Sequence, residues 1–234
     1  MKTLGLLGGM SWESTVPYYR LINEGIKQGL GGLHSARIIL YSVDFAEVEH
    51  LQRMGDWTAA GELLAQAAQK LQGAGAGAEA LVLCTNTMHK VAGAIESAVQ
   101  IPLLHIADPT AAQVHQAGLS TVGLLGTCFT MEQPFYKDRL VQQHGLQVLV
   151  PSASDRDTVH RIIYEELCLG LVREVSRQAY QRVMADLVAQ GAQAIILGCT
   201  EISLLVGPDD VPVPLFDTTA IHAGHAVDWA LGRA

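Results

Sequence analysis

The sequence predicts an α/β protein that is built from two related halves. Short apolar runs alternate along the chain with longer amphipathic ones, as expected when strands and helices alternate. The apolar runs are nearly continuous, which is typical of parallel strands that helices cover on both faces. In addition, three short motifs recur in the second half of the chain in the same order.

Eight short apolar runs predict strands, which is enough for one sheet or two. They cover residues 4–7, 37–41, 80–83, 102–106, 121–125, 146–150, 194–197 and 213–216. Amphipathic patterns between them predict helices at residues 15–28, 57–73, 87–97, 109–117, 132–144, 157–169, 175–190 and 220–231.

The internal repeat favours two sheets over one. Residues 5–9 resemble 123–127, residues 81–85 resemble 196–200, and residues 101–103 resemble 213–215. Gly126 lies 118 residues after Gly8, Cys199 lies 115 after Cys84, and Pro214 lies 112 after Pro102. Each match is weak alone, but three matches at nearly one spacing indicate two related α/β halves.

Composition excludes several classes of protein. The 234 residues are 49% hydrophobic, so the chain can bury a large core. A net charge of -8 argues against a nucleic-acid partner, because phosphate binding needs a basic face. No apolar run reaches eighteen residues, so we expect no membrane span. The apolar run near the N-terminus is short and ends in glycines, so we interpret it as a buried strand of a cytoplasmic protein.

Two of the four cysteines stand in equivalent sequence contexts. Cys84 and Cys199 each follow a predicted strand and precede a threonine. Ligands of parallel α/β sheets bind beyond the carboxyl ends of the strands. We therefore interpret this pair as functional, and Cys128 and Cys168 as packing residues. No CxxC pair occurs, so we expect neither a zinc site nor a disulfide framework.

Two thiols on opposite faces of a substrate suit inversion of a carbon centre. One thiolate removes the α-proton, and the opposite thiol supplies a new one. The residues after each cysteine favour a helix start, where backbone N–H groups lower a thiol pKa and can bind a carboxylate. The segment from Gly8 to Thr15 lacks the GxGxxG spacing of a dinucleotide site, so we expect an anion-binding turn there. Ser11 or Ser14 can alternatively cap the helix that follows.

These motifs together resemble the aspartate/glutamate racemase family over nearly the whole chain. The resemblance lies in residues 8–15, 84–89 and 198–201, and residues 11–15, 86–90 and 165–170 point to the broad-specificity amino-acid racemases of enterobacteria. It implies two pseudo-symmetric three-layer domains, each with a four-stranded parallel sheet flanked by helices, and an active site between them. It implies no pyridoxal phosphate, no metal, and a homodimer. The first domain is expected to comprise residues 1–105 plus 216–234, and the second residues 106–215.

The resemblance also assigns roles to residues. Cys84 and Cys199 match the catalytic pair, and Arg53 matches an arginine that pairs with a side-chain carboxylate, although it can equally be a solvated surface residue. Glu201 can orient a neighbour or the substrate ammonium group, or cap a helix. The expected substrate-binding residues are Met10, Ser11, Arg53, Thr85, Asn86, Thr87, Thr127, Thr200 and Glu201.

One departure from the family pattern bears on the substrate. Aspartate-specific members often carry a lysine where Cys168 stands here, so the resemblance favours a broader set of amino acids that includes homoserine. Related activities stay open: hydantoin racemase, maleate isomerase, or a non-enzymatic amino-acid sensor. Because both cysteines are present, an arylmalonate decarboxylase, which keeps one, is disfavoured.

Overall fold

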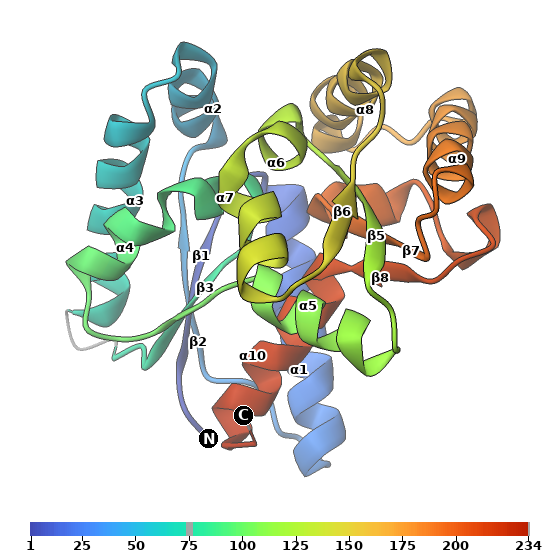
Figure 1. Cartoon of the computed structure of the whole chain (residues 1–234). Coiled ribbons are helices and arrows are strands. Elements are labelled where there is room, and N and C mark those ends of the chain that lie inside the picture. Colours follow the sequence, from blue (N-terminus) through green and yellow to red (C-terminus); the bar gives the residue numbers. More distant parts are fainter. Residues whose placement is uncertain (74–76, 234) are drawn as a thin grey trace. The chain divides into compact units, whose positions relative to one another are not determined.

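The computed structural model describes residues 1–73 and 77–233, which form two compact units (Figure 1). The first unit comprises Met1–His105 and the segment that begins at His222, and the second comprises Ile106–Ile221. Each unit contains one four-stranded parallel sheet. The strand orders, β2-β1-β3-β4 and β6-β5-β7-β8, are the same order repeated. This confirms the predicted α/β class with two four-stranded parallel sheets.

All eight predicted strands are present. They are β1 (Leu4–Gly8), β2 (Ile38–Ser42), β3 (Ala80–Leu83), β4 (Leu103–Leu104), β5 (Thr121–Gly126), β6 (Gln147–Leu149), β7 (Ala194–Gly198) and β8 (Leu215–Asp217). The central strands β1, β3 and β7 are buried along their whole length, which explains why they read as continuous apolar runs.

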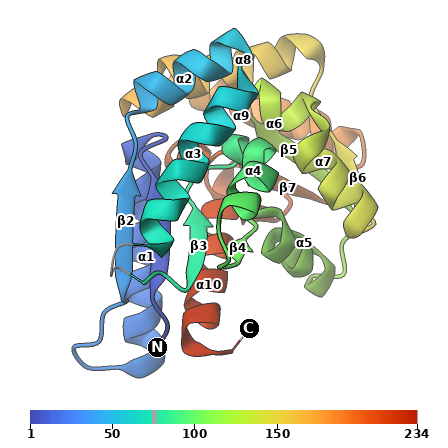
Figure 2. The same cartoon turned by 90° about the vertical axis from the view of Figure 1, so that its left-hand side faces the viewer.

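Helices cover both faces of the first sheet. They are α1 (Trp12–Leu30), α2 (Phe45–Met54), α3 (Trp57–Gln72), η1 (Thr87–Val91), α4 (Ala92–Ala98) and α10 (Thr218–Leu231), of which the part from His222 onward belongs to this unit. Alternate strand residues face opposite sides. Leu6 and Val82 pack with α1 and α10, whereas Leu7 and Leu83 pack with α2, α3 and α4. Figure 2 shows α3 lying along this second face.

Helices also cover both faces of the second sheet. Its helices are α5 (Ala107–Gln116), α6 (Cys128–Glu132), α7 (Pro134–Asp138), η2 (Arg139–Gln143), α8 (Ala153–Glu165), η3 (Leu167–Leu169), α9 (Glu174–Ala189), η4 (Thr200–Leu204) and η5 (Pro208–Asp210). Leu124 and Ile196 pack with α5, α7 and η2, and Leu125 and Ile195 pack with α8 and α9. None of the helices in the described part of the chain is long and apolar enough to cross a bilayer.

The structure differs from the predicted elements in several places, of which three change a helix or a boundary between the units. Helix α2 lies where no helix was predicted, and its ends are an Asp44 cap and Gly55 in the left-handed conformation. The predicted helix at residues 132–144 is divided into α7 and η2. Phe216 pairs with Ile196 in the second sheet, so the second unit continues to Ile221 rather than ending at residue 215. Whether the units are independent domains stays a prediction.

A buried polar network joins α1 to α10 inside the first unit. The Nε2 atom of His222 lies 2.7 Å from the Leu104 carbonyl oxygen, which can only accept, so we assign the ring proton to Nε2. In the neutral ring Nδ1 then accepts the hydrogen bond from the Tyr18 hydroxyl at 2.8 Å. Both side chains are fully buried, so this bond is made without competition from water.

Replacing Tyr18 with phenylalanine is expected to destabilise the protein by about 1–3 kcal/mol, because His222 Nδ1 is deprived of this buried donor. Tyr19 is the matched control, since its side chain is 55% exposed on the same helix. We expect Tyr19→Phe to change the free energy of unfolding by less than about 0.5 kcal/mol. Urea unfolding of both variants measures the difference. Equal stability of the two variants would show that the hydroxyl contributes nothing.

Candidate active site

The first unit presents a tight glycine turn at the carboxyl end of β1. Gly9 has a φ of 92°, and a Cβ atom there would lie 2.2 Å from the Val43 carbonyl oxygen, so only glycine fits. The Gly9 N–H donates to Thr15 Oγ1 at 2.9 Å. Met10 and Ser11 follow and are buried, with Ser11 at the N-cap position of α1. The predicted substrate turn is therefore a backbone feature held by α1.

Cys84 is the first residue after β3 and is fully buried. Its N–H donates to the Leu7 carbonyl oxygen at 3.0 Å, and its Sγ lies 3.7 Å from the Val82 carbonyl oxygen. Thr85, Asn86 and Thr87 follow and are also buried. The His89 Nδ1 atom lies 2.8 Å from the Thr85 carbonyl oxygen and closes this loop onto η1.

Ser14 joins the glycine turn to the cysteine loop. Its hydroxyl donates to the Ser11 carbonyl oxygen at 2.8 Å and lies 3.5 Å from the Cys84 carbonyl oxygen. Ser14 therefore does not cap α1, as was expected of it, but lies inside the first turn. The structure thus brings together the two predicted segments of the first unit at one edge of its sheet.

Arg53 lies in the last turn of α2. Its guanidinium group lies 3.2 Å from His50 Nδ1 and 3.6 Å from a Glu49 carboxylate oxygen, and its side chain is 64% exposed. The preceding residue, Gln52, is buried instead and donates to the Met88 sulfur at 3.0 Å. The substrate role of Arg53 stays a prediction.

In the second unit, Thr127 follows β5 and caps α6. Its Oγ1 accepts a hydrogen bond from the Thr130 N–H at 3.3 Å. The next residue, Cys128, is partly buried, and its Sγ lies 3.7 Å from the Arg156 carbonyl oxygen. Burial is the largest cause that raises the pKa of Cys128 to about 11. These contacts agree with a packing role for Cys128.

Cys199 is the first residue after β7, and its thiol donates to the Glu201 carboxylate at 3.0 Å. The Thr200 hydroxyl donates to the same Glu201 oxygen at 2.8 Å. Cys168, in η3, places its Sγ 3.7 Å from the other Glu201 oxygen. Glu201 is only 3% exposed. The buried carboxylate is therefore shared by two thiols and one hydroxyl, a cluster that the sequence did not reveal for Cys168.

The predicted lowering of the two thiol pKa values is wrong. Burial raises the pKa of Cys84 above its ordinary value. Burial, followed by the Glu201 charge, raises the pKa of Cys199 well above that value. The expected helix starts are short 3₁₀ segments, η1 and η4, which offer few aligned peptide dipoles. Desolvation of the thiolate outweighs them.

The two cysteines are not strictly equivalent in register. Leu7 pairs with Leu83, so Cys84 follows at the level of Gly8. In the second sheet Gly126 pairs with Gly198, so Cys199 lies one residue farther along. Because side chains alternate along a strand, Cys84 packs on the α1 face and Cys199 on the α8 and α9 face. The two thiols therefore have different surroundings.

No group of three or more His, Cys, Asp or Glu side chains among residues 1–73 and 77–233 has the arrangement of a metal site. The Cys84 and Cys199 thiols are the candidate groups for proton transfer, and the Cys199 thiol lies 3.0 Å from a Glu201 carboxylate oxygen.

A model of the Asp/Glu/hydantoin racemase family matches residues 7–226. The broad-specificity amino-acid racemase RacX of Bacillus subtilis (strain 168) is 21% identical over 97% of this chain and 98% of its own length. The residues that the family model matches therefore include the glycine turn, both cysteine loops and Glu201.

Solved structures with the same fold include two with clear sequence similarity. A candidate Asp/Glu racemase from Yersinia pestis is 62% identical, with a TM-score of 0.91 over 99% of this chain and 100% of that chain. An aspartate racemase homologue from Pyrococcus horikoshii OT3 is 32% identical, with a TM-score of 0.84 over the same shares. With its repeated sheets and paired Cys-Thr loops, the chain belongs to the Asp/Glu/hydantoin racemase family.

Proposed function

We propose that this protein is a cofactor-independent amino-acid racemase in which Cys84 and Cys199 exchange the α-proton of the substrate. The observation that carries the proposal is the position of a Cys-Thr pair directly after β3 and directly after β7, the corresponding strands of the two sheets. Parallel α/β sheets bind ligands at this edge. One thiol from each unit supplies the two groups that inversion requires.

The reaction proceeds by proton removal and proton return. One cysteine, as thiolate, takes the α-proton and becomes a thiol, which leaves a carbanion at Cα. The other cysteine, as thiol, gives its proton to the opposite face of Cα and becomes a thiolate. The product is the mirror-image amino acid, and the roles of the cysteines exchange for the reverse reaction. Because the α-proton of an amino acid is a weak acid, raised thiol pKa values make both thiolates stronger bases.

The substrate carboxylate needs hydrogen-bond donors that are in place before the carbanion forms. We assign this role to the Met10 and Ser11 turn and to the loop of Thr85, Asn86 and Thr87. All of these residues are buried and lie at the sheet edge that carries Cys84. Thr127 takes the corresponding place at the edge of the second sheet, after β5.

Glu201 acts in this proposal through Cys199 as a positioning residue. Its carboxylate accepts the Cys199 S–H and so keeps that thiol protonated and oriented until the carbanion forms. After the proton has left, the same negative charge makes the Cys199 thiolate a stronger base for the reverse reaction. Thr200 and Cys168 hold the carboxylate in place from both oxygens.

The substrate class is expected to be broad. Cys168 has a neutral thiol, which contacts the Glu201 carboxylate at 3.7 Å. A buried anion with hydroxyl and thiol donors offers no cation to a second substrate carboxylate. Neutral amino acids such as homoserine are therefore proposed beside aspartate and glutamate.

Proton exchange in D2O tests the proposal without knowledge of the substrate. Single L-amino acids, 5-substituted hydantoins and maleate are incubated with the protein without added cofactor, and deuterium at Cα and chirality are followed. We expect at least one amino acid to exchange and racemise, whereas the double variant C84S/C199S gives neither. Exchange of hydantoins alone would replace the proposal with a hydantoin racemase. No reaction across the panel would refute the enzyme.

A further inference from the structure

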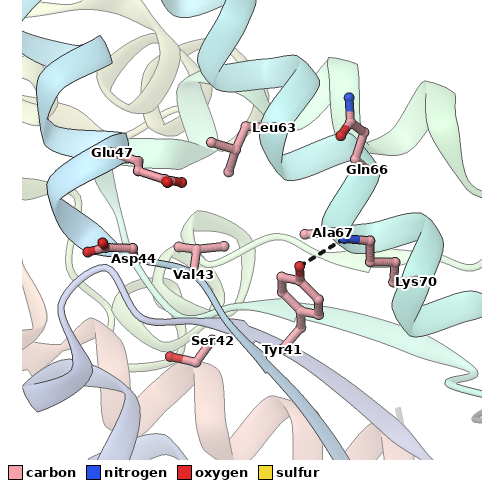
Figure 3. Close-up of a pocket in the computed structure, with 9 residues that line it drawn as sticks. All are labelled: Tyr41, Ser42, Val43, Asp44, Glu47, Leu63, Gln66, Ala67 and Lys70. Carbon is pink, nitrogen blue, oxygen red and sulfur yellow. Dashed lines mark hydrogen bonds between the residues drawn. The ribbon is translucent and has the colours of Figure 1, made fainter.

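A cavity of about 190 Å³ opens in the first unit beyond the end of β2 (Figure 3). Its walls come from the segment that links β2 to α2, from the first turn of α2, and from one face of α3. Its lining is mostly polar, with Val43, Leu63 and Ala67 as the apolar residues among it. None of the residues assigned to the candidate active site lines this cavity.

The charged groups around the cavity are separated by sign. Asp44 and Glu47 lie on the α2 side, and Lys70 lies on the α3 side beside Tyr41 (Figure 3). Asp44 is engaged as the cap of α2, where it accepts the Ala46 N–H at 3.1 Å. Within the described residues, the Glu47 carboxylate has neither a hydrogen bond nor an ion pair with another side chain.

Lys70 lies on the other side of the cavity from Glu47 and has no acidic partner in the described part of the chain. Its Nζ donates to the Tyr41 hydroxyl at 3.0 Å and lies 5.0 Å from the centre of the Tyr41 ring. Tyr41 therefore holds the ammonium group at the rim of the cavity. An acidic side and a basic side thus face one small space, and neither neutralises the other.

We propose that this cavity is a binding site for a small zwitterion, with the ligand ammonium group at Glu47 and its carboxylate at Lys70. A cavity of about 190 Å³ holds several water molecules and so has room for a ligand the size of a small amino acid. The apolar lining residues Val43, Leu63 and Ala67 can contact the methylene groups between the two charges.

The proposed site does not depend on racemase activity. It also differs from a simple ion site, because a metal cation would use only the acidic side and an inorganic anion only Lys70. The charged side chains are exposed, so each contact contributes only about 0–1 kcal/mol. We therefore expect weak binding, on the order of 1 mM.

The test uses ligands that have no α-stereocentre and so cannot be racemised. β-Alanine, 4-aminobutyrate and 5-aminopentanoate are titrated into ¹⁵N-labelled protein, with butylamine and butyrate as single-charge probes. We expect one zwitterion to cause saturable shifts of amide signals at Val43 and along residues 63–70. Each single-charge probe is expected to bind about fivefold more weakly, which is about 1 kcal/mol.

Matched variants assign the charges. Glu47→Gln and Lys70→Met are each expected to weaken the zwitterion about fivefold. Glu62→Gln, on the same helix as Lys70 but outside the cavity, and Lys27→Met on α1 are expected to leave its affinity unchanged. Shifts confined to other residues, equal binding of butylamine, or equal affinity in all four variants would overturn the proposal. Absence of saturable shifts with every zwitterion would also overturn it.

Discussion

Cys84→Ser and Cys199→Ser are each expected to lower the rate of racemisation by about 10³-fold, within the 10²–10⁴-fold range of general acid–base catalysis. A serine hydroxyl keeps the approximate size of the thiol but is a far weaker acid, so neither proton transfer can pass through it. The matched control is Cys128→Ser. That cysteine is also partly buried in the second unit with a raised pKa, but it contacts the Arg156 carbonyl oxygen rather than Glu201.

The two variants are expected to differ in which enantiomer exchanges its α-proton. A variant that retains one thiol can still remove the α-proton from the enantiomer that presents it to that thiol, and return a deuteron to the same face. Cys84→Ser should therefore exchange one enantiomer and Cys199→Ser the other, both without inversion. The proposed pair of bases would be refuted if both variants exchanged the same enantiomer, or if either racemised normally.

Steady-state rates cannot replace this exchange measurement. The two enantiomers have the same free energy in water, so their equilibrium constant is unity. Every variant must then show equal kcat/KM in the two directions, whichever thiol was removed. Only the fate of the α-proton distinguishes the contribution of Cys84 from that of Cys199. Proton NMR of each pure enantiomer in D2O reads it directly.

The sequence was sufficient for the fold because buried parallel strands leave a strong pattern. Residues 80–83 were predicted as a strand and observed as β3 with the same bounds. Helix α2 was missed because its pattern is short, and the stronger signals, the Asp44 cap and the Gly55 end, flank it rather than lie within it. The bond between Tyr18 and His222 spans 204 positions, and no local pattern reports such a contact.

The sequence indicated candidate residues for the site, whose roles stay a prediction, but it did not indicate the electrostatics around them. The repeated Cys-Thr motif indicated Cys84 and Cys199, and the structure places each directly after a strand. The direction of the pKa shift depends on burial and on the Glu201 charge, which are properties of the folded chain. Cys168 could not be connected to Glu201 from sequence, because η3 and η4 are far apart along the chain.

Glu201→Gln is expected to reduce racemisation by about tenfold or more, because a neutral amide with one accepting oxygen replaces the charged carboxylate that accepts from the Cys199 and Cys168 thiols and the Thr200 hydroxyl. Its sharper effect concerns pH. The Glu201 charge raises the pKa of Cys199, so the amide variant should form the Cys199 thiolate at lower pH. The rate of Cys199 alkylation by iodoacetamide is followed by peptide mass spectrometry across pH. The pH at which this rate reaches half of its maximum is the alkylation midpoint, and it reports thiolate formation.

Glu165→Gln is the control, since that carboxylate is 65% exposed on α8 and pairs with Arg161 instead. The alkylation midpoint of Cys199 also depends on the nearby Cys168 thiol. Tyr180 and Glu166 belong to the same cluster, and we expect their effect on this midpoint to be equal in Glu201→Gln and Glu165→Gln. A role confined to packing would lower activity in Glu201→Gln but leave the alkylation midpoint where it stands in the parent protein. Restored activity and a restored midpoint in Glu201→Asp would assign the effect to the charge itself, because that variant keeps the carboxylate while it shortens the side chain by one carbon.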